Sequence, residues 1–309
     1  NIYGRLLTAP ADFNVRIDQF FDSPMYNYPE NVYTVEDLTE NLQNGTPVTL
    51  MNDLTLDTLP VDETKGATID LNGKTLTVNN MVNVEGIVTI KNGTYVTGSN
   101  IAFNMKDTGV LNLSGVKTHA ESTVVLIEPE NADWTGSVNI EKSELTGGDY
   151  CVSTNAKHAA EFVGKMLNYN INLTNTTMTG CETPLLVNVP LHVNVNTCTL
   201  EGSWQGMVMR GGHADMINSE IKTTCTEQAN DVAQGQGNQV PRAALTVLNG
   251  GAYKYDSTVT ATLCSFTGND NVPSVYALNN YVNIPLLAQV ETKHCTFTGL
   301  APVGPVIRR

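Results

Sequence analysis

The segment that decides the fold is "VNIEKSELTG", residues 138–147, because the same ten-residue frame returns four more times along the chain. Each copy alternates apolar and polar residues, passes a small residue at its sixth position, and then alternates again up to a final Gly. Period-two alternation is typical of β-strands, so each copy predicts two short strands that meet at a small-residue corner. The other copies are "INLTNTTMTG" at 171, "VNVNTCTLEG" at 193, "VTATLCSFTG" at 259 and "VETKHCTFTG" at 290.

A third apolar strand recurs between the copies of this frame. One unit of three short strands cannot bury its own apolar side, but stacked units bury a continuous core, so the repeat predicts a solenoid. The third strands are "MVNV" at 81, "IAFNM" at 101, "TVVLI" at 123, "YCVST" at 150, "PLLVNV" at 184, "GMVMR" at 206, "ALTVL" at 244 and "VYAL" at 275. The aligned sixth positions are Gly93, Val116, Ser143, Thr176, Cys198, Ser219, Cys264 and Cys295, and the shorter gaps between them are 21 to 23 residues.

Leucine-rich repeats have a similar period, but this frame lacks their Leu-rich pattern and their helical half. The pattern instead resembles the right-handed parallel β-helix of the pectate-lyase-like superfamily. In particular, "ATIDLNGKTLTVNN" at 67 looks like the first coil of exported bacterial and phage β-helix proteins. The resemblance covers residues 45–300 and implies an all-β solenoid of roughly nine coils, about 40 Å long at the usual strand spacing. A shared architecture does not fix a function.

The start of the solenoid carries a predicted helix. In "YTVEDLTENLQNG", Thr34 is placed as the N-cap, Leu38 and Leu42 lie on one face with Val35, and Asn44-Gly45 is a stop signal. We expect this helix, residues 34–44, to cap the open strand edges of the first coil. The C-terminal "TFTGLAPVGPVIRR" predicts no helix, so a short coil or another molecule would cover that end. Residues 34–309 would then form a single β-helix domain.

Residues 1–33 are predicted to be a separate aromatic-rich arm. They hold 7 of the 20 aromatic residues of the chain. The arm would either pack along the flank of its own solenoid or dock on a neighbouring molecule, since aromatic residues are enriched at interfaces. The second alternative implies a homo-oligomer or polymer. The candidate assembly residues are Phe13, Phe20, Phe21, Tyr26 and Tyr28.

Composition and charge exclude several function classes. The chain has 38 Thr and 34 Asn, which suit strands and tight turns, and a formal net charge of −14 with a pI near 4.7. Such a charge repels nucleic acid and anionic lipid, and no apolar run is long enough to span a bilayer. The first residue is Asn1 and not Met, so we expect that either a leader was removed or the chain was trimmed. We expect an extracellular, cell-surface or virion location.

The six cysteines form no CxxC pair and no zinc-binding spacing, so no metal and no cofactor is predicted. Three of them, Cys198, Cys264 and Cys295, occupy the sixth position of the frame, where other copies carry Ser or Thr. A position that accepts Ser, Thr and Cys is interpreted as one selected for small size. We therefore expect buried free thiols, with disulfides in an exported protein as the alternative.

The repeat offers little catalytic chemistry. Glycoside hydrolysis needs two carboxylates on neighbouring coils, and the third strands at 101, 123, 184, 206, 244 and 275 contain no Asp or Glu. The polygalacturonase-type signatures are absent, and His213 and Asp215 are interpreted as residues flanking a turn. Lyase chemistry needs a base such as Arg210 or Arg242 and usually Ca²⁺ held by several carboxylates, but neither arginine has a cluster of acids nearby in the sequence. No catalytic residue is predicted.

Two segments interrupt the repeat: 156–169, predicted to be a short helix, and the polar stretch 226–241. Both are either tolerated insertions or part of a binding or assembly face. The sequence favours a non-catalytic structural or adhesive protein of a surface assembly, such as a filament, adhesin or phage fibre, with a carbohydrate or surface receptor as a partner. The alternative is a polysaccharide lyase or glycoside hydrolase that acts on acidic polysaccharide.

Overall fold

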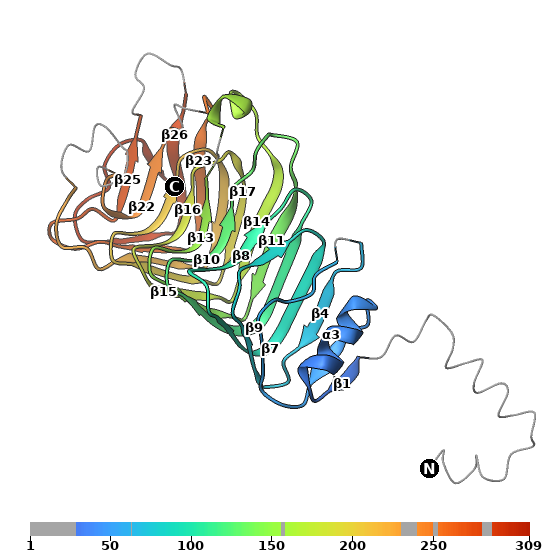
Figure 1. The fold of residues 1–309 in the computed structure, drawn as a ribbon. Helices are drawn as coiled ribbons and strands as arrows, with labels where there is room; N and C mark the ends of the chain where they lie inside the picture. The colour runs from blue at the N-terminus through green and yellow to red at the C-terminus, as the bar shows by residue number, and fades with distance from the viewer. Residues whose placement is uncertain (1–28, 63, 156–157, 230–239, 250–252, 280–285) are drawn as a thin grey trace, which may run out of the picture.

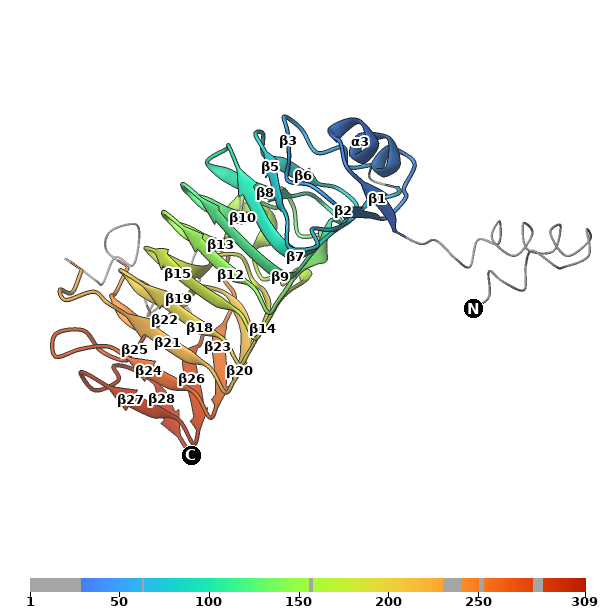
Figure 2. The same cartoon turned by 90° about the horizontal axis from the view of Figure 1, so that it is seen from below.

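The computed structural model describes residues 29–62, 64–155, 158–229, 240–249, 253–279 and 286–309. Within these ranges the protein is all-β, with long parallel sheets of 20 and 8 strands. Figure 1 shows the strands stacked in sequence order from β1 and α3 at one end, and Figure 2 labels β27 and β28 at the other end. This arrangement is consistent with a parallel β-helix, the class that the repeat predicts.

The 20-stranded sheet consists of two columns of parallel strands that share the long strands β7 and β9. The first column contains β1 (Glu30–Val32), β2 (Val48–Leu50), β4 (Ala67–Asp70), β7 (Ile87–Thr97), β9 (Val110–Ala120), β11 (Thr135–Glu141), β14 (Asn168–Thr174), β17 (Leu191–Asn196), β20 (Gly212–Ile217), β23 (Ser257–Thr262), β26 (Ala288–Lys293) and β28 (Val306–Arg308). The second column adds β3 (Leu54–Leu56), β5 (Thr75–Val78), β12 (Glu144–Gly147), β15 (Thr177–Cys181), β18 (Thr199–Gly202), β21 (Glu220–Thr223), β24 (Ser265–Thr267) and β27 (Thr296–Thr298).

The 8-stranded sheet contains one strand for each of the eight third strands predicted from the sequence. These strands are β6 (Val82–Val84), β8 (Ile101–Met105), β10 (Thr123–Ile127), β13 (Tyr150–Thr154), β16 (Thr183–Val187), β19 (Gln205–Met209), β22 (Ala243–Leu248) and β25 (Val275–Leu278). A rung is defined here as one strand from the first column, the second-column strand that follows it, and the next strand of the 8-stranded sheet. Alternate residues of every rung point inward and form one continuous apolar core.

The corner between the two columns has a fixed backbone form. The residue before the sixth position adopts a positive φ, as at Asn92 (61°), Asn175 (47°) and Asn218 (49°), and Gly115 (64°) serves the same position. Asn and Gly are the residues that tolerate this left-handed conformation best. The following residue is buried at Ser143, Thr176, Cys198, Ser219 and Cys264.

Hydrogen bonds explain why this corner residue is Ser, Thr or Cys at six of the eight aligned positions. The Ser219 hydroxyl accepts from the backbone N–H of Cys198 on the preceding rung at 3.0 Å and donates to the carbonyl of Ile217 at 2.8 Å. Ser143 makes the same pair of bonds, to the N–H of Val116 and the carbonyl of Glu141. The interpretation as small size alone is therefore incomplete, because the position also uses a side chain that can both donate and accept.

Helix α3 (Val35–Gln43) begins where the sequence predicts it. The hydroxyl of Thr34 accepts a hydrogen bond from the N–H of Asp37 at 3.1 Å, and Leu38 and Leu42 are buried. The helix lies against β1, β2 and β3 (Figure 2). The other predicted helix is shorter than expected: the described part of 156–169 holds only the 3₁₀ turn η1 (Ala159–Phe162), with Phe162 buried against Tyr253. No helix in the described ranges has the length and apolar character to cross a membrane.

Candidate functional site: a groove along the corner

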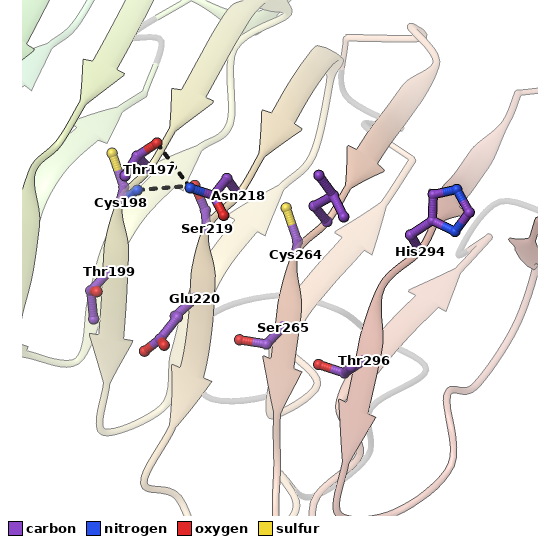
Figure 3. Close-up of a pocket in the computed structure, with 11 residues that line it drawn as sticks. Thr197, Cys198, Thr199, Asn218, Ser219, Glu220, Cys264, Ser265, His294 and Thr296 are labelled. Carbon is purple, nitrogen blue, oxygen red and sulfur yellow. Dashed lines mark hydrogen bonds between the residues drawn. The ribbon is translucent and has the colours of Figure 1, made fainter.

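A groove of about 490 Å³ runs along the corner between the two columns, across four successive rungs (Figure 3). Because stacked strands lie about 4.8 Å apart, four rungs give the groove a length of roughly 14 Å. Each rung contributes the positive-φ residue and its neighbours. The lining residues are Thr197, Cys198, Thr199, Asn218, Ser219, Glu220, Leu263, Cys264, Ser265, His294 and Thr296.

Three of the four positive-φ residues beside this groove are neither Asn nor Gly, the residues that most other rungs carry there. Thr197 (55°), Leu263 (56°) and His294 (53°) stand where other rungs carry mostly Asn or Gly. A β-branched Thr in this conformation is a genuine outlier, and a left-handed L-residue costs roughly 1–2 kcal/mol. Leu263 is in addition 57% exposed. Backbone outliers cluster at functional sites. Lys142 (49°) is a similar exception at the corner outside this groove, so it is the run of three exceptions in four successive rungs that points to the groove.

One wall of the groove is a row of polar side chains in register on the second column. Thr199, Glu220, Ser265 and Thr296 come from four adjacent strands and are spaced by one rung each. Figure 3 shows them below the corner residues. Glu220 also forms an ion pair with Lys222 at 2.6 Å. Hydroxyls spaced along a rigid wall, with an apolar side chain at Leu263, suit an extended polar ligand that has some apolar surface.

The cysteines at the corner belong to the fold. All six cysteines are free; Cys198 and Cys264 are buried as predicted, while Cys295 is partly exposed. Burial raises the pKa of the Cys198 thiol, which keeps it in the unreactive neutral form. Its sulfur donates to the carbonyl of Asn196, as the serine hydroxyls do at other rungs. These contacts give the thiols a structural role.

His213 and Asp215 lie in a strand and contact each other, so the interpretation that they flank a turn is wrong. Both lie in strand β20, where the Nε2 atom of His213 is 3.1 Å from a carboxylate oxygen of Asp215. The Nδ1 atom of the same ring is 2.8 Å from the Thr258 hydroxyl on the next rung. This row of three hydrogen-bonded groups resembles a hydroxyl–imidazole–carboxylate triad, which is one way to activate a nucleophile. However, β20 and β23 are paired on both sides, so their backbone N–H groups form no oxyanion hole there.

A pair of carboxylates that sequence reasoning missed lies beside the 8-stranded sheet. Asp149 and Glu182 directly precede β13 and β16, so they occupy matching places on adjacent rungs. Burial, and then the charge of Asp149, raise the pKa of Glu182, while Arg242 opposes the rise. Both acids stand one position before a strand, so a pattern confined to the strands does not include them.

The same column of turns continues with an aromatic and a basic residue. Trp204 precedes β19, and the guanidinium of Arg242, which precedes β22, lies 3.5 Å from the centre of the Trp204 ring. Arg242 is only 8% exposed, and its Nη1 atom has no hydrogen-bond partner among the described residues. Sequence reasoning named Arg242 as a basic candidate without acids nearby; the fold brings the charge of Glu182 close to it.

Other predicted sites lie partly or wholly outside the described residues. Phe13, Phe20, Phe21, Tyr26 and Tyr28 all fall in the range 1–28. The ends of the 226–241 segment are described: the Gln228 side chain bonds the backbone of Arg242, and Val240 is buried with Val208 and Leu248. Among the described residues, no three His, Cys, Asp or Glu side chains gather closely enough to hold a metal ion.

Comparisons with known proteins identify no relative: the chain matches no family model, no curated protein and no solved structure.

Proposed function

We propose that the protein is a non-catalytic, adhesive β-helix element of a surface assembly, and that the corner groove binds a carbohydrate. In this proposal the chain is a right-handed solenoid of the pectate-lyase-like kind with roughly nine coils, capped at its front by α3. The protein acts outside the cell, on a cell or virion surface, and associates with further copies of itself.

The observation that carries the proposal is Leu263. Its side chain is apolar, 57% exposed and held at a φ of 56°, so it is unfavourable for both solubility and backbone conformation. The equivalent residue one rung earlier is Asn218, which meets neither difficulty. A residue that disfavours folding at a groove is expected to be retained for contact with a ligand. The hydroxyl wall beside it offers hydrogen bonds of the kind that sugar hydroxyls make.

The test is binding to a panel of neutral, uronic-acid and amino-sugar oligosaccharides, measured by calorimetry. The intact protein should bind at least one class, and Leu263→Asn should weaken binding about tenfold or more, the loss expected when a buried apolar contact of a little over 1 kcal/mol is removed. Ile87→Asn is the matched control, because Ile87 is equally exposed on β7 but lies far from the groove. Equal affinities of Leu263→Asn and the intact protein would exclude this groove as the binding site.

The second candidate function is a polysaccharide lyase or glycoside hydrolase, which the Asp149 and Glu182 pair favours. A carboxyl group with a raised pKa can act as general acid while its ionised neighbour acts as base. Arg242 would then hold the carboxylate of an acidic sugar. Incubation with pectins and alginates, followed by measurement of unsaturated products and new reducing ends, separates the two functions. Turnover that Glu182→Gln abolishes would establish the enzyme and refute the adhesive proposal.

A further inference from the structure

The outer face of the first column carries a ladder of amide side chains. The Asn112 amide donates to the Thr89 hydroxyl at 3.0 Å, and Asn139 donates to Asn112 at 2.8 Å. Asn172 then donates to Asn139 at 2.7 Å, and Asn194 donates to Asn172 at 2.8 Å. Every amide donates toward the N-terminal end, and Asn112, Asn139 and Asn172 each accept from the next rung. Each side-chain oxygen within the ladder is therefore satisfied by the amide that follows it.

The ladder stops at strand β20. The residue in register with Asn194 on the next rung is Asp215, which has no N–H group to donate. On the next rung, the side-chain oxygen of Asn194 therefore has a carboxylate beside it in place of an amide. None of the described residues donates a hydrogen bond to this oxygen. One oxygen of Asp215 accepts from His213. Two acceptors stand on adjacent rungs with no donor between them, where an Asn at position 215 would have continued the ladder.

A groove of about 360 Å³ opens at this position. Its polar lining comes from Asn194, Asn196, Asp215, Thr260 and Thr262, and no Lys or Arg is among the lining residues. Asn194 and Asp215 are both exposed, so a ligand can reach them from solvent. The groove adjoins the corner groove, because Asn196, Ile217 and Thr262 each precede a positive-φ residue that lines it. A ligand that extends across the corner would contact both grooves.

We propose that this interrupted ladder binds the primary ammonium group of an amino-sugar glycan, an inference that rests on the proposed carbohydrate-binding function. An ammonium group has three donors and a positive charge, so it satisfies Asn194 and Asp215 together. Its bond to the carboxylate is charge-assisted and stronger than a bond from a neutral hydroxyl. The net charge of −14 attracts a cationic ligand at long range. The hydroxyls and amides of the same groove can accept hydrogen bonds from the neighbouring sugar hydroxyls and donate hydrogen bonds to them.

The experiment compares glucosamine oligomers with their N-acetylated forms, which have the same length and no charge. The intact protein should bind the amino form at least tenfold more tightly, and the difference should shrink with added salt. Asp215→Asn should remove this preference while raising the thermal midpoint, because the new amide completes the ladder. Asp107→Asn, at an exposed turn on another rung, is the control for net charge and should change neither quantity.

A reciprocal variant tests the ladder itself. Asn139→Asp places a carboxylate in the middle of the ladder and should lower the thermal midpoint while leaving the amino-sugar preference in place. Equal binding of both oligomers, or an unchanged preference in Asp215→Asn, would overturn the ammonium site while leaving carbohydrate binding at the corner intact. Failure to bind any glycan would refute the proposed function as well. Tighter binding of lysine oligomers than of amino sugars would assign the site to a peptide and overturn the inference.

Discussion

Ser219 illustrates how much one small side chain does at the corner of a rung. Its hydroxyl bonds both the N–H of Cys198 and the carbonyl of Ile217, and the residue is 2% exposed. Ser219→Ala leaves the Cys198 N–H buried without a partner, so the free energy of unfolding should fall by about 1–3 kcal/mol. Ser219→Cys keeps a group that donates and accepts, as at Cys198 and Cys264, and should lose less. Urea titration measures both, and equal losses would show that only size matters.

A substitution at Leu263, the positive-φ residue of the next rung, should change the free energy of unfolding in the opposite direction. Leu263→Asn places a residue that tolerates positive φ where Leu is unfavourable, so the protein should gain about 1 kcal/mol in free energy of unfolding. The control Ile87→Asn removes an equally exposed apolar side chain from a strand, where no positive φ is relieved, and should not stabilise. A destabilised Leu263→Asn protein would mean that the leucine contributes to folding, which would remove the main support for the corner groove.

At the scale of elements, the apolar pattern was enough to predict the strands. All eight third strands became β6, β8, β10, β13, β16, β19, β22 and β25, because short apolar runs that recur between turn residues bury their side chains when they stack. The corner was also predicted, from the small residue at the sixth position of the frame. The helix from Thr34 was predicted because its capping residue and apolar spacing are local features.

The candidate sites were harder to predict because they depend on which residues the stacking brings together. Asp149 and Glu182 are 33 positions apart in the sequence yet stand before paired strands. His213 and Thr258 meet for the same reason, across the segment 226–241. The alternation of apolar and polar residues predicts which side chains face outward. It does not predict which residues pair between neighbouring rungs, because the rungs differ in length. Once Asn139, Asn172 and Asn194 are aligned by register, the interruption at Asp215 can be read from the sequence.

The turn column that holds Glu182 gives a pH-dependent prediction. Burial and Asp149 raise its pKa above the ordinary value of 4.5, so the folded protein holds this proton more tightly than the unfolded chain. Ionised Glu182 therefore disfavours the folded state above its folded pKa, and this cost disappears below pH 4.5, where both states are protonated. Glu182→Gln should raise the thermal midpoint at pH 7, and its advantage should close below pH 4.5. An advantage that is constant with pH would contradict an electrostatic cause.

At the scale of the whole molecule, charge is distributed unequally along the stack. The residues around β1 and α3 include Glu30, Glu36, Asp37 and Glu40, and α3 contains no basic residue. The rungs at the other end carry Lys293, Arg308 and Arg309 against one acid, Glu291, which pairs with Arg309, together with the exposed side chain of Ile307. Strands β1 and β28 are the first and last strands of one column. An acidic front and a basic back are complementary for a head-to-tail contact between copies.

A head-to-tail contact is heterologous, so it forms a filament unless its rotation closes a ring. We therefore predict that the 309-residue protein associates with rising concentration in light scattering, and that salt weakens the association because exposed charges are screened. Arg308→Glu with Arg309→Glu should reduce association strongly, whereas Lys117→Glu, on an exposed site in the middle of the stack, should not. A truncated chain that starts at Tyr33 tests the aromatic arm separately: lost association would assign the contact to residues 1–32, and unchanged association would assign it to the charged ends. A full-length protein that stays monomeric at high concentration and low salt refutes both forms of self-assembly.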